Sequence, residues 1–314
     1  MLQVVSADPR TVTPAFSLLY GHWPEPERKR LVRDALQSVS EQTLNLQHLL
    51  VARKSDSPSV LGAALAVERP GREAIVWLPG VAPGESADGV VPLLLSELAH
   101  RLDQAGVVCS VAFVDPLQSD DRQRLACSGY PGIADLCLME TRVSPRLFPG
   151  AFSPSPFESI PWSEQRADEF ARVIEQTQKE GCDCPEVGAF RTGHDVLASH
   201  GSSATPEPHL WQLYRRPGET EPSGILLLGA TGLPEELEIQ YLGVAPHARR
   251  QGFARQLLQH ARRLALSQGK DRLHVAVESR NLPALSLYRA DGFRETRRFA
   301  IHLRLHPHAV PVAS

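Results

Sequence analysis

The fold is decided by the stretch Glu238-Ile239-Gln240-Tyr241-Leu242-Gly243-Val244-Ala245-Pro246-His247-Ala248-Arg249-Arg250-Gln251-Gly252-Phe253-Ala254. Its first seven residues are typical of a strand. Strict alternation would place Glu238, Gln240 and Leu242 on one face of that strand, with Ile239 and Tyr241 on the other. The stretch therefore predicts a strand that passes within a few residues into a helix.

The start of that helix has the features of an anion site. Gly252 and Ala254 are small, so a ligand can approach the backbone closely. The first N–H groups of a helix have no partner within it and carry the positive end of the helix dipole, which suits a pyrophosphate. Arg249, Arg250 and Arg255 add positive charge at the same end. We expect a phosphate-binding loop here.

The surrounding sequence predicts further helices and strands in a mixed α/β order. Apolar residues recur at helical spacing between residues 252 and 268, and a second helix begins with Asn281 as its cap and ends at Gly292. An earlier helix is expected from Ser163 to about Gly181. Short apolar or alternating runs predict strands at Leu210–Arg215, Gly224–Leu228, Leu237–Val244, Leu273–Val277 and Phe299–Leu305.

The chain contains an internal repeat. The tetrapeptide Gly-Val-Ala-Pro occurs at Gly80–Pro83 and at Gly243–Pro246, an offset of 243 − 80 = 163. The same offset pairs Gly89 with Gly252, Leu94 with Leu257, Gly106 with Gly269, Val114 with Val277 and Gly129 with Gly292. We expect two tandem domains, residues 1–143 and 163–314, joined by a proline-rich linker at 144–162.

Length and composition fit a two-domain protein without a nucleic-acid or membrane partner. The chain has 314 residues, enough for two cores, and a net charge of −3 from 33 basic and 36 acidic residues. The sequence shows neither a leader pattern nor an apolar run long enough to span a bilayer, so a cytoplasmic location is expected. Five cysteines predict reduced thiols and no disulfide framework.

Several of these motifs together resemble the GNAT superfamily of acyl-CoA-dependent N-acyltransferases: Val244-Ala-Pro, Arg249-x-x-Gly252-x-Ala254, Asn281, Tyr288 and Gly292-Phe293. The resemblance covers Leu210 to Leu305 and, in weaker form, most of the first half. It implies two GNAT-like domains, each a mixed and mostly antiparallel sheet flanked by helices. It also implies acetyl-CoA as cofactor, bound by Leu242, Val244, Arg249, Arg250, Gln251, Gly252, Phe253, Ala254, Arg255 and Asn281.

The resemblance implies two catalytic residues. Tyr288 matches the tyrosine that protonates the departing thiolate, a role suited to a phenol with a pKa of about 10. Glu238 matches the strand position where several members carry the base that deprotonates the amine. Glu236 and direct deprotonation by water are the alternatives. Tyr288 could instead be only a core aromatic, although its spacing from Asn281 and Gly292 favours the functional interpretation, and Glu238 could be only a strand-edge carboxylate.

The region around Cys182 and Cys184 admits two interpretations. Two thiolates at this spacing need two further metal ligands that the sequence does not supply nearby, so no metal is expected. The resemblance places the loop between the first two helices at the acceptor cleft, where Asp183, Glu186 and Arg191 could hold the substrate. On the helix that follows Gly252, Arg262 and Arg263 are interpreted as solvated charges.

The first repeat has lost the residues that carry the chemistry. At the same offset, Ser86, Ala87 and Asp88 replace the Arg-Arg-Gln of the phosphate loop, while Leu125, Gln118 and Ile75 replace Tyr288, Asn281 and Glu238. We expect the first domain to bind no cofactor and to act as a structural or acceptor-gating partner.

The expected activity is N-acetyl transfer from acetyl-CoA to a primary amine by direct attack. Tandem members of the superfamily include mycothiol synthases, whose first half is likewise degraded, so a small-molecule amine is the expected acceptor. Two alternatives stay open: a non-catalytic acyl-CoA-binding sensor, and a protein or peptide N-acetyltransferase. Oligomeric state is not indicated.

Overall fold

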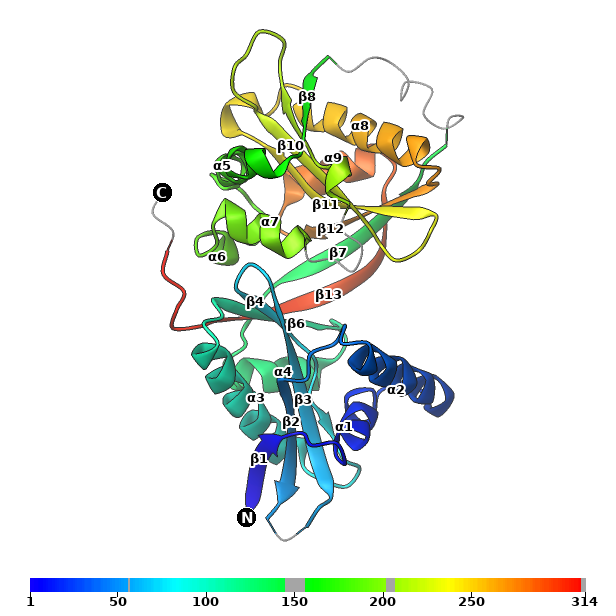
Figure 1. Cartoon of the computed structure of the whole chain (residues 1–314), viewed down its shortest axis with the longest axis vertical. Helices are drawn as coiled ribbons and strands as arrows, with labels where there is room; N and C mark the ends of the chain where they lie inside the picture. Colours follow the sequence, from blue (N-terminus) through cyan, green and yellow to red (C-terminus); the bar gives the residue numbers. More distant parts are fainter. Residues whose placement is uncertain (56, 145–155, 202–206, 312–314) are drawn as a thin grey trace. The chain divides into compact units, whose positions relative to one another are not determined.

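The computed structural model describes residues 1–55, 57–144, 156–201 and 207–311, and the chain divides into two compact units (Figure 1). Unit 1 comprises Met1–Ile133 and Phe299–Val310, and unit 2 comprises Ala134–Arg298 and Pro311–Ser314. Most of the predicted linker, residues 145–155, lies outside the described residues. Its last part is a strand, β8 (Glu158–Pro161), which pairs with β9 (Gln212–Arg215).

Unit 2 is built on a mixed sheet with helices on both faces (Figure 1). Its strands follow the order β7-β12-β11-β10-β9-β8; β11 and β12 pair in parallel, whereas the β7–β12, β10–β11, β9–β10 and β8–β9 pairings are antiparallel. Helices α5 and α7 contribute to the core on one face, and α8 and α9 to the core on the other. The remaining elements are β7 (Gly132–Arg142), α5 (Ala167–Gln178), α6 (Pro185–Gly188), α7 (Gly193–Gly201), β10 (Gly224–Ala230), β11 (Glu236–Val244), α8 (Phe253–Ser267), β12 (Arg272–Glu278) and α9 (Leu282–Ala290). The last strand, β13 (Arg294–Leu305), begins in unit 2 and continues into unit 1.

Unit 1 repeats this plan. Its strands follow the order β1-β2-β3-β4-β6-β13, with β5 beside β3, and the β4–β6 pairing is parallel. Helices α1 and α2 pack on one face of the sheet, and α3 and α4 on the other. The elements are β1 (Leu2–Ser6), α1 (Val12–Leu19), α2 (Glu25–Ser40), β2 (His48–Lys54), β3 (Val60–Arg69), β4 (Glu73–Val76), β5 (Gly80–Val81), α3 (Ala87–Gln104), β6 (Cys109–Val114) and α4 (Ser119–Cys127).

The repeat found in the sequence is present in the structure. Helix α4 (Ser119–Cys127) and helix α9 (Leu282–Ala290) start and end at the same offset, 282 − 119 = 163 and 290 − 127 = 163. The expected fold, two mixed α/β domains of the same plan, is confirmed at the level of these elements.

The last strand of each repeat belongs to the unit formed mainly by the other repeat. Residues 136–142 of β7 pair with β12 in unit 2, and residues 300–305 of β13 pair with β6 in unit 1. Directly after β13, the His306 ring lies 2.7 Å from Ser110 Oγ through Nε2 and 2.5 Å from Asp103 Oδ1 through Nδ1. The compact units therefore divide the chain differently from the predicted halves 1–143 and 163–314.

Arg262 contradicts the prediction of a solvated helix charge. Its side chain is 1% exposed, its guanidinium donates to the carboxylate and carbonyl of Asp291, and its Cζ lies 5.7 Å from the ring centre of Phe293. Desolvation lowers the pKa of Arg262 to about 10, so the side chain stays charged at neutral pH. The polar residue type suggested exposure, but a carboxylate within reach allows the charge to be buried.

We expect Arg262→Met to lower the free energy of unfolding by about 3–5 kcal/mol, because removing one partner leaves the Asp291 carboxylate desolvated and unpaired. Urea titration measures the effect, with Arg289→Met as the control because Arg289 is exposed on α9. The double variant Arg262→Met, Asp291→Asn should recover part of the loss. A cost for Arg262→Met no larger than that for Arg289→Met would contradict the buried ion pair.

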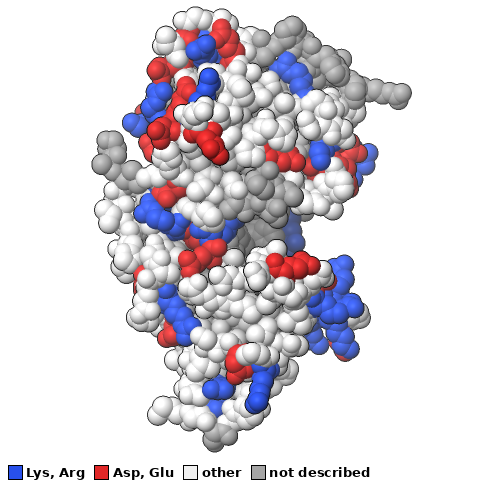
Figure 2. Space-filling model, in the orientation of Figure 1, with Lys and Arg blue, Asp and Glu red and all other residues white. Residues whose placement is uncertain are grey.

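Charges are mixed over the face of the molecule seen in Figure 2, with a cluster of basic side chains over α2. The basic residues of α2 are Arg28, Lys29, Arg30 and Arg33, and Lys29 pairs with Glu25 at 2.6 Å. In the described part of the chain, no helix combines the length and the apolar character needed to cross a bilayer.

Candidate functional site

Strand β11 contains a bulge that one-to-one alternation did not predict. Opposite β10, Leu227 pairs with Tyr241 and Leu228 with Ile239, so Gln240 is an extra residue. An extra residue inverts the face of every side chain that follows it. The prediction that Leu242 shares the face of Glu238 is therefore wrong.

The faces of β11 after the bulge follow from the packing. Leu242 and Val244 pack against the same core as Ile239, on the side of α8. Tyr241 packs with the core of α5 and α7, and its hydroxyl lies 2.8 Å from Thr177 Oγ1 on α5. The hydroxyl of Tyr241 is thus engaged on the opposite side of the sheet from Leu242.

Beyond the bulge, β11 separates from β12. Their parallel register ends at Ile239–Val275, whereas the pairing of β11 with β10 continues to Val244. Residues 240–244 of β11 therefore have no strand partner on the β12 side. Backbone groups of a strand that lack a ladder partner can pair with an extended ligand.

The helix start after β11 has an open row of backbone donors. Arg250 and Gly252 adopt positive φ angles of 61° and 79°. Among the residues that the structure describes, none accepts a hydrogen bond from the backbone N–H groups of residues 250–255. A Cβ at Gly252 would have no atom within 4 Å, so the space beside Gly252 is open. Unpaired N–H groups at the start of a helix are the kind of donors that bind anions.

Arg249, predicted as a phosphate-site cation, has its guanidinium turned into the protein. It donates to the carbonyl oxygens of Val244 at 3.0 Å, Thr177 at 3.0 Å, Lys179 at 2.8 Å and Glu180 at 3.1 Å. Those bonds use four of the five N–H groups of an arginine. The side chain joins the end of α5 to the end of β11, and any contact it makes to a phosphate comes from its backbone or its local charge.

The other predicted loop residues divide by exposure. Arg250, Gln251 and Arg255 are exposed, and the side chain of Gln251 is held by the His247 carbonyl and by Arg216. The side chain of Phe253 is buried and stacks on Phe157, so only the backbone of Phe253 is available to a ligand.

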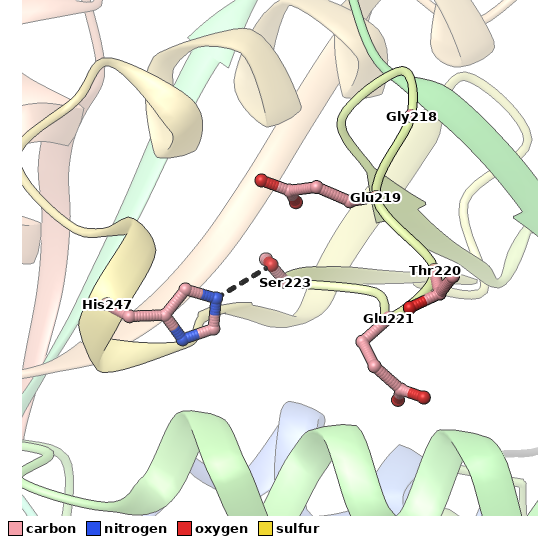
Figure 3. A pocket seen from close by; sticks show the side chains of 6 residues that line it. All are labelled: Gly218, Glu219, Thr220, Glu221, Ser223 and His247. Atoms are coloured by element: carbon pink, nitrogen blue, oxygen red, sulfur yellow. Dashed lines mark hydrogen bonds between the residues drawn. The ribbon is translucent and has the colours of Figure 1, made fainter.

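A small pocket of about 310 Å³ lies next to this loop (Figure 3). Ser223 Oγ and His247 Nε2 are 3.0 Å apart in it, and Glu219 and Glu221 also line it. Its two carboxylates disfavour a phosphate. We interpret the Ser223–His247 hydrogen bond as a support for the loop.

Asn281 follows the end of β12 and starts α9, and Tyr288 lies seven residues further along the same helix. Asn281 caps α9 as predicted, because its Oδ1 accepts from the N–H of Ala284 at 3.2 Å. Tyr288 is 5% exposed, and no residue in the described part of the chain hydrogen-bonds its hydroxyl. Burial first, and then the negative charge of Asp183, raise the pKa of Tyr288, so the phenol stays protonated at neutral pH.

The loop between α5 and α6 approaches the same place. Glu278, 0% exposed at the end of β12, accepts from the N–H of Cys184 at 2.6 Å, and its own N–H lies 3.4 Å from Asp183 Oδ1. Arg280 binds Glu278 and also both carboxylate oxygens of Glu186, at 2.7 and 2.8 Å. The loop is therefore fixed to the end of β12.

Of the three residues predicted to hold a substrate, only Asp183 lies exposed beside Tyr288. Glu186 is engaged by Arg280, and Arg191 donates to the carbonyl of Asp195 at 3.0 Å. Cys182 is exposed and Cys184 half-buried, and in the described part of the chain no three His, Cys, Asp or Glu side chains are grouped so that they could hold a metal ion.

Glu238 and Glu236 lie lower on β11, where it still pairs with β12. Glu238 is half-buried opposite His274, one residue before the register ends. Glu236 is buried, 3.0 Å from His274 Nε2 and 3.4 Å from Arg272. Because Glu236 is enclosed by these two side chains, Glu238 is the better placed of the two predicted bases.

The corresponding place in unit 1 has different chemistry. The first turn of α3 contains Asp88, which pairs with Arg124 of α4 at 2.9 Å. Leu125, which replaces Tyr288, is buried in the core. In unit 1, the Asp88 carboxylate therefore lies at the position where the helix start of unit 2 has backbone N–H groups that donate to no described residue.

Comparisons with known proteins agree with this geometry. Residues 172–293 match the model of the Acetyltransferase (GNAT) family. A mycothiol acetyltransferase of Jonesia denitrificans is 40% identical over 75 residues, which are 24% of this chain and 24% of that protein. The chain thus matches about a quarter of the length of this curated relative.

Solved structures share the fold along the whole chain. A GCN5-related N-acetyltransferase from Sphaerobacter thermophilus has a TM-score of 0.60 at 16% identity, covering 100% of this chain and 98% of its own. A tandem GNAT protein from the clavulanic acid biosynthesis pathway has a TM-score of 0.51 at 15% identity, covering 100% of both chains. At these identities the likeness concerns the fold.

Two kinds of match define the class of protein. The solved structures show a tandem α/β fold, and residues 172–293 match the acetyltransferase family model. The second half of the chain contains a domain of the GNAT acetyltransferase family.

We expect Arg249→Met to destabilise unit 2 by about 2–3 kcal/mol, because four carbonyl oxygens lose a charged donor. Arg250→Met, one residue away and exposed, should change stability by less than about 0.5 kcal/mol. Urea unfolding of both variants measures the difference. Equal stabilities for the two variants would show that Arg249 does not hold the loop.

Proposed function

We propose that unit 2 transfers an acetyl group from acetyl-CoA to a primary amine of a small molecule. The observation that carries this proposal is the row of backbone N–H groups at 250–255, which donate to no described residue. Such donors bind a diphosphate without a dedicated side chain. Support for a small acceptor comes from the name of the mycothiol acetyltransferase relative.

The residues present could hold the successive parts of acetyl-CoA, from the diphosphate through the pantetheine arm to the thioester. The N–H groups of 250–255 would hold the diphosphate, and the unpaired edge of β11 at 240–244 would pair with the pantetheine arm. Tyr288, in the last turn of α9, packs in the core against which Leu242 and Val244 of β11 also pack, and we place the thioester end of the arm beside it. When bound, acetyl-CoA supplies the activated thioester.

Each proposed catalytic residue has a defined proton task. Glu238, directly or through water, takes the proton that the attacking amine must lose. As the new C–N bond forms and the C–S bond breaks, Tyr288 donates its hydroxyl proton to the leaving thiolate. The raised pKa of Tyr288 keeps that proton in place until the thiolate develops.

Unit 1 takes no part in cofactor binding in this proposal. The Asp88–Arg124 pair supplies an internal anion at the first turn of α3, and Leu125 has no proton to give. Unit 1 instead has a structural role, or gates access of the acceptor.

We expect calorimetry to detect one CoA per chain, with binding at least tenfold weaker in Gly252→Val. Valine is strained at a φ of 79°, and its side chain would occupy the open space before the donors. Gly269→Val is the matched control, since Gly269 has a φ of 69° and equal space at the other end of α8. Two CoA per chain, or equal affinity in both variants, would refute this site.

We expect Tyr288→Phe to lower kcat about 10²- to 10⁴-fold and to leave CoA affinity unchanged, because only the proton donor is lost. No described residue bonds the hydroxyl, so the variant should fold normally. The assay follows release of CoA thiol from acetyl-CoA with a panel of amines, including glucosamine, tyramine and lysine. CoA binding by the native protein without thiol release on any amine would favour an acyl-CoA sensor.

A further inference from the structure

The last strands of the two repeats, β7 and β13, pair in the same register, although each lies in the unit formed mainly by the other repeat. In unit 1, Arg304 of β13 is opposite Ser110, and in unit 2, Thr141 of β7 is opposite Leu273. The two pairs are related by the repeat offset, since 304 − 141 = 163 and 273 − 110 = 163. By backbone pairing alone, either strand could therefore complete either sheet.

The residue that follows each strand is also bound alike through its backbone. The N–H of His306 donates to the carbonyl of Val108 at 2.9 Å. At the same offset, the N–H of Val143 donates to the carbonyl of Asp271 at 2.6 Å. The side chains differ, because unit 1 receives a histidine where unit 2 receives a valine.

The histidine lies in a polar site of unit 1. The His306 side chain is 0% exposed, with Nδ1 2.5 Å from Asp103 Oδ1 and Nε2 2.7 Å from Ser110 Oγ. Ser110 Oγ lies 3.2 Å from the hydroxyl of Tyr130, and both residues are buried. Because a carboxylate only accepts, Nδ1 carries a proton and donates it to Asp103. Both ring nitrogens of His306 thus have a partner.

The valine lies in an apolar site of unit 2. Val143 is 2% exposed and belongs to the same core as Leu273 and Phe293, against which Leu266 also packs. Each site therefore matches the side chain that it receives. At the repeat offset, the counterparts of Leu266, Leu273 and Phe293 are Asp103, Ser110 and Tyr130, in this order.

A second position shows the same contrast. His302 of β13 is 2% exposed, and its Nδ1 lies 2.8 Å from the carbonyl oxygen of Tyr130. Its counterpart in β7 is Met139, which is 1% exposed in the apolar core of unit 2. If the strands changed places, the His306 ring would be buried among apolar side chains and Asp103 would lose its partner. Both changes are unfavourable, because a buried polar group without a hydrogen bond costs free energy.

We propose that the polar site formed by Asp103, Ser110 and Tyr130 recognises His306 and so selects β13, and not β7, as the last strand of unit 1. A buried polar network is well suited to this task, because it penalises the wrong partner more than it stabilises the right one. Unit 1 thereby holds the end of a strand that begins in unit 2. This selection is independent of the proposed acetyl transfer, since none of its residues belongs to the proposed acetyl-CoA site.

The test cleaves the folded full chain between the repeats, at a protease recognition sequence inserted between residues 150 and 151. In the native arrangement each fragment contributes a strand to the sheet of the other. Size-exclusion chromatography should therefore recover one species, also when the chain is unfolded in urea and refolded before cleavage. A chain whose repeats close on their own last strands would give two separate fragments.

The main variant gives unit 1 the side chains that unit 2 has at the same positions. This set already packs together in unit 2, so the variant should fold, but the two sites no longer distinguish the strands. After refolding and cleavage, at least about a tenth of the protein should elute as separate fragments. His308→Val is the matched control, because His308 is an exposed histidine of the same segment, and it should give one species. The main variant combines Asp103→Leu, Ser110→Leu, Tyr130→Phe, His302→Met and His306→Val.

The single variant His306→Val tests the same selection if the combined substitutions prevent folding. Both last strands are then followed by valine, so a separated fraction is again expected, together with a lower urea midpoint. Folded variants that separate no more than His308→Val would overturn the selection. Native fragments that separate without denaturant would refute the exchange of the two strands, and the selection with it.

Discussion

The geometry of unit 2 depends on the single extra residue in β11. Gln240 interrupts the pairing with β10, and its side chain lies over Gly229, where a Cβ would be 2.2 Å from its Nε2, so a larger residue at 229 would displace the Gln240 side chain. The bulge is followed at once by the separation of β11 from β12, whose register ends at Ile239. An extended ligand can bind only where a strand has lost a neighbour. The bulge and the separation together leave the edge of β11 at which we propose that the pantetheine arm binds.

The loop after β11 shows how an anion site can be stabilised without using its most obvious cation. Arg249 lies in the predicted motif, yet its guanidinium binds carbonyl oxygens at the end of α5 and at Val244. Those bonds hold the backbone next to Arg250 and Gly252, whose φ angles are positive, and the N–H groups of 250–255 donate to no described residue. In the proposed site, a backbone ordered in this way would lose little entropy when a phosphate binds.

The local sequence pattern predicted most helices and strands of unit 2. It did not predict the features that depend on residues far away in the sequence. The cap at Asn281 and the extent of α9 follow from residue types at fixed spacing, and both are observed. The bulge at Gln240 was not predictable, because an extra residue leaves no mark on apolar alternation. The sequence predicts a solvated Arg262, because nothing in the local pattern shows that Asp291 faces it. The sheet that β7 and β13 each join was also not predictable, because a strand with a given apolar pattern can pair in either sheet.

The two repeats share the same backbone arrangement but differ in the side chains at the ends of its strands and helices. Both have a parallel strand pair, β4–β6 and β11–β12, and a helix that starts beside its end. In unit 1 the first turn of that helix carries Asp88, which Arg124 neutralises. An internal ion pair at such a site competes with any external anion, so one acidic residue suffices to disfavour phosphate there. The fold was duplicated whole, whereas the capacity for chemistry depends on a few side chains at strand and helix ends.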